Sequence, residues 1–136
     1  MSNDPAETTA ASPLSSSTGD ITVDEAVEQI RDGAVLVDVR SAAEWQQVGV
    51  PITDGIGNPV VFVEWADSHG TRNPGFLEEI APLEGQEILF LCRSGRRSAA
   101  AAEYARAAGH TTYNILHGFE TAGGWQDRRL AWKRTE

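Results

Sequence analysis

The sequence predicts an α/β domain built on a parallel β-sheet with helices on both faces. Short apolar segments alternate with segments that carry helix-capping residues or helical periodicity, as in sheets whose strands are joined by helical crossovers. The apolar segments have the length and composition of strands buried on both faces. There are four of them, over residues 34–39, 60–65, 87–92 and 111–116.

The first helix is expected to begin after Thr22. Thr22 and Glu25 have the spacing of a capping box, in which the hydroxyl and the carboxylate satisfy free amides at a helix start. Apolar residues follow at helical spacing as far as Ile30, and Gly33 is a suitable stop. The first strand comes directly afterwards.

The same capping pattern recurs after the first strand. Ser41 and Glu44 predict a short second helix that carries Trp45, and Glu44 is interpreted as a helix cap rather than a catalytic acid. Residues 49–59 are rich in glycine and proline and predict a loop before the second strand. A further loop precedes a short helix over residues 75–80.

The third strand ends at the cysteine, Cys92. The alanine-rich segment from about residue 98 to 108 predicts a strong helix, which Gly109 ends. The fourth strand follows this glycine.

Composition limits the class of protein. The chain has 136 residues and a formal net charge of −9, which argues against nucleic acid or an anionic membrane as a partner. One cysteine excludes an internal disulfide and fits a reducing, cytoplasmic setting. The three histidines lack metal-ligand spacing, so no metal site is expected. We expect no other cofactor.

The chain divides into two parts. Residues 1–20 contain almost no large apolar side chains and predict a disordered arm, without the apolar run of a secretory signal. Residues 21–136 are long enough for one domain. No segment approaches the roughly 20 apolar residues of a transmembrane helix. We therefore expect a cytoplasmic protein, acting as a monomer.

The segment around Cys92 carries the chemistry. Cys92 lies where a strand leads into a helix, the position of ligands in parallel sheets. A tight turn containing Gly95 would direct successive amides inward as an anion-binding nest, and the helix adds its positive end. Arg93, Arg96 and Arg97 add cationic side chains. These groups favour a thiolate, so Cys92 is interpreted as a nucleophile rather than as a small buried hydrophobe.

A phosphate-binding loop is the nearest alternative. The Walker pattern fails because no lysine followed by serine or threonine closes the loop. The pattern of cysteine phosphatases places an arginine six residues after the cysteine. Here the sixth residue is Ser98, and Arg97 comes one position early. The spacing predicts a smaller cup, without phosphatase activity.

Four segments together resemble the rhodanese family of sulfurtransferases. They are "LVDVRSAAEW" (36–45), "LFLCRSGRRSAAAA" (89–102), "AGHTTYNILHGFETAGGW" (108–125) and "LAWKR" (130–134). The resemblance covers about residues 21–134, and the cysteine loop is its most specific part. Residues 50–73 depart from the family pattern, because Gly49-Val50-Pro51-Ile52 replaces the usual glycine-histidine-isoleucine turn.

The resemblance implies a five-stranded parallel sheet and a covalent sulfur transfer. Cys92 would take the outer sulfur of thiosulfate, hold it as a persulfide and pass it to a thiol, cyanide or protein acceptor. Asp38 and Arg40 would support the loop. Residues around the cysteine would bind the substrate, either through charge or through backbone and hydroxyl hydrogen bonds; they are Arg93, Ser94, Gly95, Arg96, Arg97 and Ser98.

Three questions stay open from the sequence. Asp38 and Arg40 fit either a solvated pair at a strand end or a supporting role. His117, just after the fourth strand, could assist an acceptor. The same cysteine loop suits an enzyme that uses free thiosulfate and a sulfur-carrier module that another protein's persulfide loads.

Overall fold

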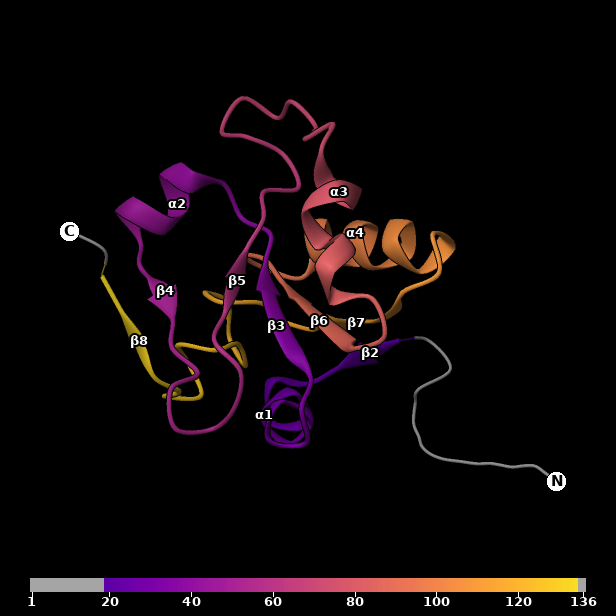
Figure 1. The fold of residues 1–136 in the computed structure, drawn as a ribbon. Coiled ribbons are helices and arrows are strands. Elements are labelled where there is room, and N and C mark those ends of the chain that lie inside the picture. The colour runs from indigo at the N-terminus through magenta and orange to yellow at the C-terminus, as the bar shows by residue number, and fades with distance from the viewer. Residues whose placement is uncertain (1–18, 135–136) are drawn as a thin grey trace, which may run out of the picture.

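A five-stranded parallel sheet forms the centre of the molecule in the computed structural model, which describes residues 19–134 (Figure 1). The strand order is β2–β7–β6–β3–β5, and each neighbouring pair is parallel. The strands are β2 (Asp20–Ile21), β3 (Val35–Asp38), β5 (Val61–Phe62), β6 (Glu87–Leu91) and β7 (Thr111–Ile115). The predicted α/β class with a five-stranded parallel sheet is confirmed.

Helices cover both faces of this sheet. Helix α1 (Val23–Arg31) lies on one face, and α3 (Phe76–Ile80) and α4 (Arg96–Ala107) lie on the other (Figure 1). Side chains alternate along the strands, so each strand contributes to two cores. In β6, Phe90 packs into the core under α3 and α4, whereas Leu89 packs into the core under α1. A 3₁₀ turn, η2 (Ala81–Leu83), leads from α3 towards β6.

The helix starts follow the local signals. Both predicted capping boxes are present, at Thr22 before α1 and at Ser41 before α2 (Ala42–Gln47). Helix α4 begins at Arg96, two residues before the predicted start at residue 98. It does so because Gly95 takes a left-handed conformation (φ +104°) and turns the chain directly into the helix.

Two strand regions differ from the prediction, and the first forms a separate two-stranded sheet. Residues 50 and 51, expected in a loop, form β4 (Val50–Pro51), which pairs antiparallel with β8 (Trp132–Lys133). The second predicted strand, residues 60–65, is regular only over the two residues of β5. The β4–β8 pairing ties the last part of the described chain to the segment that follows α2.

The boundary of the predicted arm also differs from the structure. Residues 1–18 lie outside the described part of the chain. Asp20, which the sequence assigned to the arm, is the first residue of β2, and Gly19 directly precedes this strand. Asp20 pairs with Asn114 of β7, and the Asn114 amide donates to the Gly19 carbonyl at 2.7 Å.

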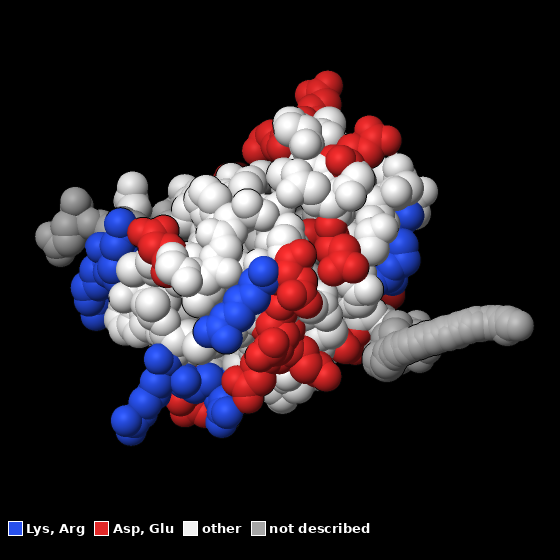
Figure 2. Space-filling model, turned by 60° about the horizontal axis from the view of Figure 1, so that its bottom comes forward, with Lys and Arg blue, Asp and Glu red and all other residues white. Residues whose placement is uncertain are grey.

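The surface is strongly acidic on the side that carries α1. Figure 2 shows a band of carboxylates across this face, with basic side chains grouped beside it. The exposed residues of α1 include Asp24, Glu25 and Glu28. Over residues 19–134, no helix has the length and apolar character needed to cross a membrane.

Candidate active site

Cys92 lies between β6 and α4, at the carboxyl edge of the parallel sheet. Its side chain is buried, with 1% of the residue exposed. The apolar strand before it sets this depth, because β6 runs through the middle of the sheet between β7 and β3. The sequence placed the cysteine at this edge, and the structure agrees.

Backbone amides of the loop point at the cysteine sulfur. The Gly95 amide donates to Sγ at 3.1 Å and the Ser98 amide at 3.3 Å. The Ser98 hydroxyl oxygen lies 3.3 Å from the same sulfur. A side chain at position 95 would be strained by the positive φ, although its Cβ would make only ordinary contacts with the Ile115 carbonyl and the His117 amide. Donors aimed at one atom from a helix start stabilise a negative charge on it.

A second segment, the turn after β7, donates hydrogen bonds to the backbone of the cysteine loop. The Phe119 amide donates to the Cys92 carbonyl at 2.8 Å, and the Glu120 amide donates to the Arg93 carbonyl at 3.1 Å. Gly118 makes this approach possible, since a Cβ there would lie 2.4 Å from both carbonyl oxygens. The turn after β7 therefore fixes the shape of the cysteine loop. The contact between this glycine and the cysteine loop could not be predicted from the sequence.

Arg97 is held by a carboxylate from another helix. Its guanidinium donates twice to Glu44 of α2, from Nη1 to Oε1 at 2.6 Å and from Nη2 to Oε2 at 2.9 Å. Burial alone would raise the pKa of Glu44, but the hydrogen bonds from Arg97 and Ser41 outweigh it and lower the pKa to about 2. The pKa of Arg97 is raised, chiefly by its hydrogen bond to Glu44. Glu44 is thus the predicted helix cap and also a partner of the cysteine loop.

The other loop residues differ in exposure. Arg93 forms an ion pair with Glu120, with Nε 3.4 Å from Oε1, and its side chain is largely exposed. Arg96 and Ser94 are exposed, and no ion pair of Arg96 occurs within residues 19–134. The rim of the cup is therefore cationic but partly neutralised by carboxylates.

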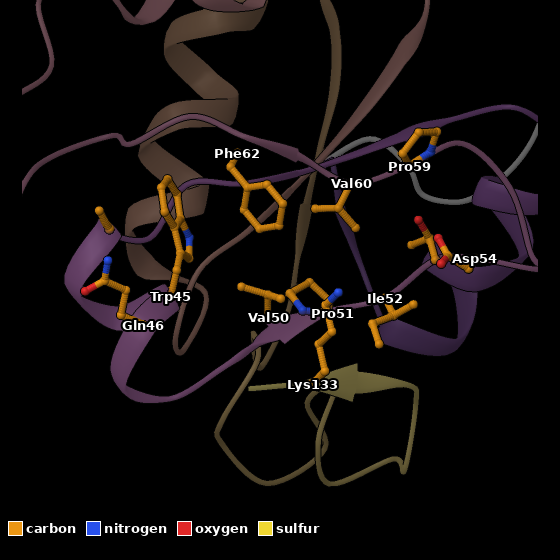
Figure 3. A pocket seen from close by; sticks show the side chains of 12 residues that line it. Trp45, Gln46, Val50, Pro51, Ile52, Asp54, Pro59, Val60, Phe62 and Lys133 are labelled. Atoms are coloured by element: carbon orange, nitrogen blue, oxygen red, sulfur yellow. The ribbon is translucent and has the colours of Figure 1, made fainter. Parts of the chain in front are cut away.

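A cleft opens beside the loop. It is lined by Arg93 and Arg97, by α2 residues that include Glu44, and by the loop over residues 66–70, and it has a volume of about 540 Å³. A different, apolar pocket of about 520 Å³ lies on the other side of α2 (Figure 3). Trp45 and Phe62 point into this pocket, and no residue of the cysteine loop lines it. Of the two, only the cleft beside the loop is lined by residues of the cysteine loop, Arg93 and Arg97.

Comparison with known proteins identifies the family. Residues 22–124 match the family model of the rhodanese-like domain. The chain belongs to the rhodanese-like domain family. It is 47% identical to the crystal structure of Rv0390 from M. tuberculosis, with a TM-score of 0.80, over 86% of this chain and 98% of that one.

Two further relatives extend the comparison. An uncharacterized protein of Rickettsia conorii is 41% identical over 106 residues, which are 75% of this chain and 85% of the relative. A rhodanese-like domain protein of Staphylococcus aureus is 19% identical with a TM-score of 0.61, over 86% of this chain and 98% of that one, and so shares the fold. The predicted resemblance is confirmed at the level of family and fold.

The rhodanese-like domain buries the pair expected to support its loop. Asp38 and Arg40 are both fully buried, with Arg40 Nη2 2.7 Å from Asp38 Oδ2. Arg40 also donates to the Gly49 carbonyl at 2.8 Å and lies 4.2 Å from the centre of the Phe119 ring. The solvated interpretation of this pair is wrong. Because Phe119 holds the Cys92 carbonyl, the pair connects β3 to the cysteine loop.

The histidines occupy different surroundings. His117 is exposed and has a left-handed backbone (φ +68°), and its amide lies beside Gly95 of the loop. His69 lies in the loop that faces the cleft, where its amide donates to Asp67. Within the described residues, no group of three or more His, Cys, Asp or Glu side chains could hold a metal ion.

The structure brings most of the predicted site residues together. Cys92, Gly95 and Ser98 form the cup around the sulfur, and Arg97 is anchored beside it. Their roles in binding substrate stay predictions. Sequence reasoning missed the partners that come from outside the loop, which are Gly118, Phe119, Glu120 and Asn114. Asn114 had a visible signal, since it is a polar residue inside an apolar strand.

Proposed function

We propose that this rhodanese-like domain is a sulfurtransferase that moves the outer sulfur of thiosulfate to a thiophilic acceptor through a persulfide on Cys92. One observation carries the proposal. The sulfur of Cys92 receives two backbone amides where a helix begins. Such an arrangement suits a sulfur that bears negative charge as thiolate, persulfide and leaving group in turn.

The first half-reaction loads the cysteine. The Cys92 thiolate attacks the outer sulfur of thiosulfate and forms a new S–S bond. The bond between the two sulfurs of thiosulfate breaks, and its electron pair leaves with sulfite. The product is a Cys92 persulfide, whose outer sulfur takes over the negative charge.

The second half-reaction unloads it. A thiolate or cyanide attacks the outer sulfur, the Cys92 S–S bond breaks, and its electron pair returns to Cys92. The amides of Gly95 and Ser98 stabilise the leaving thiolate. No electrons are gained or lost over the cycle, so the reaction needs no redox cofactor.

The arginines have separate roles in this scheme. Arg93 and Arg96 are exposed at the rim and can attract an oxyanion to the cleft. Arg97 already makes two hydrogen bonds to Glu44, so it shapes the wall of the cup and contributes charge at a fixed position. We further expect a cytoplasmic monomer without nucleic-acid or membrane partners.

A turnover assay tests the proposal. Thiosulfate and cyanide are supplied, and thiocyanate is measured for the wild type and for Cys92→Ser. We expect turnover in the wild type and none in the variant. Equal turnover in both proteins would refute the role of Cys92.

A sulfur-carrier module is the second candidate, and one observation favours it. The Cys92 sulfur is buried, and both Arg93 and Arg97 are paired with carboxylates, which leaves less free positive charge for a small dianion. A donor persulfide presented by another protein would need less of that charge. Rapid sulfur uptake from a protein persulfide, together with negligible thiosulfate turnover, would support the carrier.

A further inference from the structure

A chain of hydrogen bonds runs from the cysteine to the edge strand β2. Cys92 Sγ lies 3.3 Å from Ser98 Oγ, Ser98 Oγ lies 2.5 Å from Asn114 Oδ1, and Asn114 Nδ2 lies 3.1 Å from Asp20 Oδ1. The first three residues are buried, with at most 4% of each exposed. Asp20 is exposed, on β2.

The chemistry of these groups fixes the direction of each bond. An ionised carboxylate only accepts hydrogen bonds, so Asp20 must face the amide nitrogen of Asn114. The carbonyl oxygen of Asn114 then faces Ser98 and can only accept. The single hydroxyl proton of Ser98 is therefore directed at Asn114. Ser98 Oγ turns a lone pair towards the sulfur, where it can accept the proton of a thiol.

We propose that Asn114, oriented by Asp20, is a positioning residue that directs the Ser98 proton away from Cys92, so that Ser98 withholds a hydrogen bond from the thiolate. In the thiol form, the thiol proton can bond to Ser98 Oγ while the hydroxyl proton bonds to Asn114 Oδ1. In the thiolate form, the hydroxyl can turn to the sulfur only by leaving Asn114 Oδ1 unpaired in a buried place, which is unfavourable. Asn114 thus competes with the thiolate for one proton.

The inference rests on the proposed role of Cys92 as nucleophile, but it concerns only the resting cysteine. Other charged or titratable groups around the loop stay unchanged in the variants below. They are Arg93 on the loop, Arg96 and Arg97 at the start of α4, Glu44 on α2, Asp38 at the end of β3, Arg40 after β3, and His117 and Glu120 after β7.

The test is the pH dependence of Cys92 alkylation by iodoacetamide, without any sulfur donor. The variant Asn114→Leu keeps the branched shape of the side chain and removes the acceptor. We expect the midpoint of its alkylation profile to fall by at least about half a pH unit, a threefold change in the thiolate-to-thiol ratio. The same substitution in a Ser98→Ala background should produce no shift, because the competing proton is gone.

Asp20→Ala provides the second variant. Asp20 is exposed and lies on an edge strand, so the fold should tolerate the substitution. Without the carboxylate, the Asn114 amide is free to turn over, and the midpoint should fall in the same direction. This variant decides the matter if Asn114→Leu does not fold.

Two results would overturn the inference. One is an unchanged midpoint in the folded variants. The other is an equal shift with and without Ser98, which would assign a merely structural role to Asn114. Both are separable from the proposed function, because alkylation needs no thiosulfate. If the variants show the expected shift of the alkylation midpoint but the wild type takes up no sulfur, only the proposed function is refuted.

Discussion

Glu44 and Arg97 lie 53 positions apart in the chain and form an ion pair with two short hydrogen bonds between α2 and the first turn of α4. Helix α2 has no fully buried residue of its own, so contacts of this kind help to hold its position. The same carboxylate caps α2 through the Ser41 amide at 3.0 Å. One side chain thus positions both a helix and an arginine of the cysteine loop.

The variant Glu44→Gln should show the charge contribution of this pair. Glutamine can still complete a capping box, so the substitution removes mainly the ion pair. Because both side chains are partly exposed, we expect a loss of about 1–2 kcal/mol in the free energy of unfolding at neutral pH. Urea denaturation measures it. Glu103→Gln, on the exposed side of α4, is the matched control and should change stability by less than about 0.5 kcal/mol.

The same pair predicts a pH dependence with a definite sign. The pKa of Glu44 is about 2 in the folded protein, below its ordinary value of 4.5. Its stabilising contribution is therefore complete above pH 4.5 and is lost as the pH falls towards 2. The stability difference between wild type and Glu44→Gln should shrink over this range. A difference that stays constant from neutral pH to pH 2 would contradict the assignment.

Gly118→Ala should damage the cysteine loop. The added Cβ would lie 2.4 Å from the carbonyl oxygens of Cys92 and Arg93, so the two segments must separate. We expect a loss of more than about 2 kcal/mol, together with most of the sulfur-transfer activity. Gly85→Ala is the control, since it has a positive φ but open space around it, and should cost about 1 kcal/mol with activity kept. Equal effects of the two substitutions would show that backbone strain alone is responsible.

Arg40→Met should be more damaging than the removal of a surface arginine. It leaves the Asp38 carboxylate buried without its ionic partner, which costs about 3–5 kcal/mol. Arg128→Met breaks the exposed pair with Asp24 and should cost about 0–1 kcal/mol. Thermal and urea unfolding of the two variants give the comparison. Similar losses in both would mean that Asp38 gains access to water.

Hydrolysis of aryl phosphates should be absent. The loop from Cys92 to Arg97 is one residue shorter than a phosphatase loop, and Arg97 is already bound to Glu44. Too few amides and no free central arginine remain for a phosphate. Release of a phenol that disappears in Cys92→Ser would contradict this prediction.

The parts of the structure that the sequence predicted are those with local causes. The apolar segments around β3, β6 and β7 indicated buried strands, and the capping residues at Thr22 and Ser41 marked two helix starts. The Cys92 loop was predictable for the same reason, because its strand, glycine and helix are contiguous.

The rest depends on partners that are distant in the chain. The two-residue strands β2, β4 and β8 are too short for any periodicity, and only their pairing defines them. The bonds of Glu44 to Arg97 and of Asn114 to Ser98 likewise exist only after folding. The sequence indicated Glu44 as a helix cap and Asn114 as a strand residue, but not their bonds to Arg97 and Ser98.

Formation of a persulfide on Cys92 is the central claim, and an intact mass spectrum tests it most directly. The protein is treated with thiosulfate, freed of excess reagent and weighed without reductant, beside Cys92→Ser treated in the same way. We predict a gain of one sulfur atom in the wild type, reversed by a thiol, and no gain in the variant. An unchanged mass of the wild type after exposure to both thiosulfate and a protein persulfide, or an equal gain in Cys92→Ser, would contradict it.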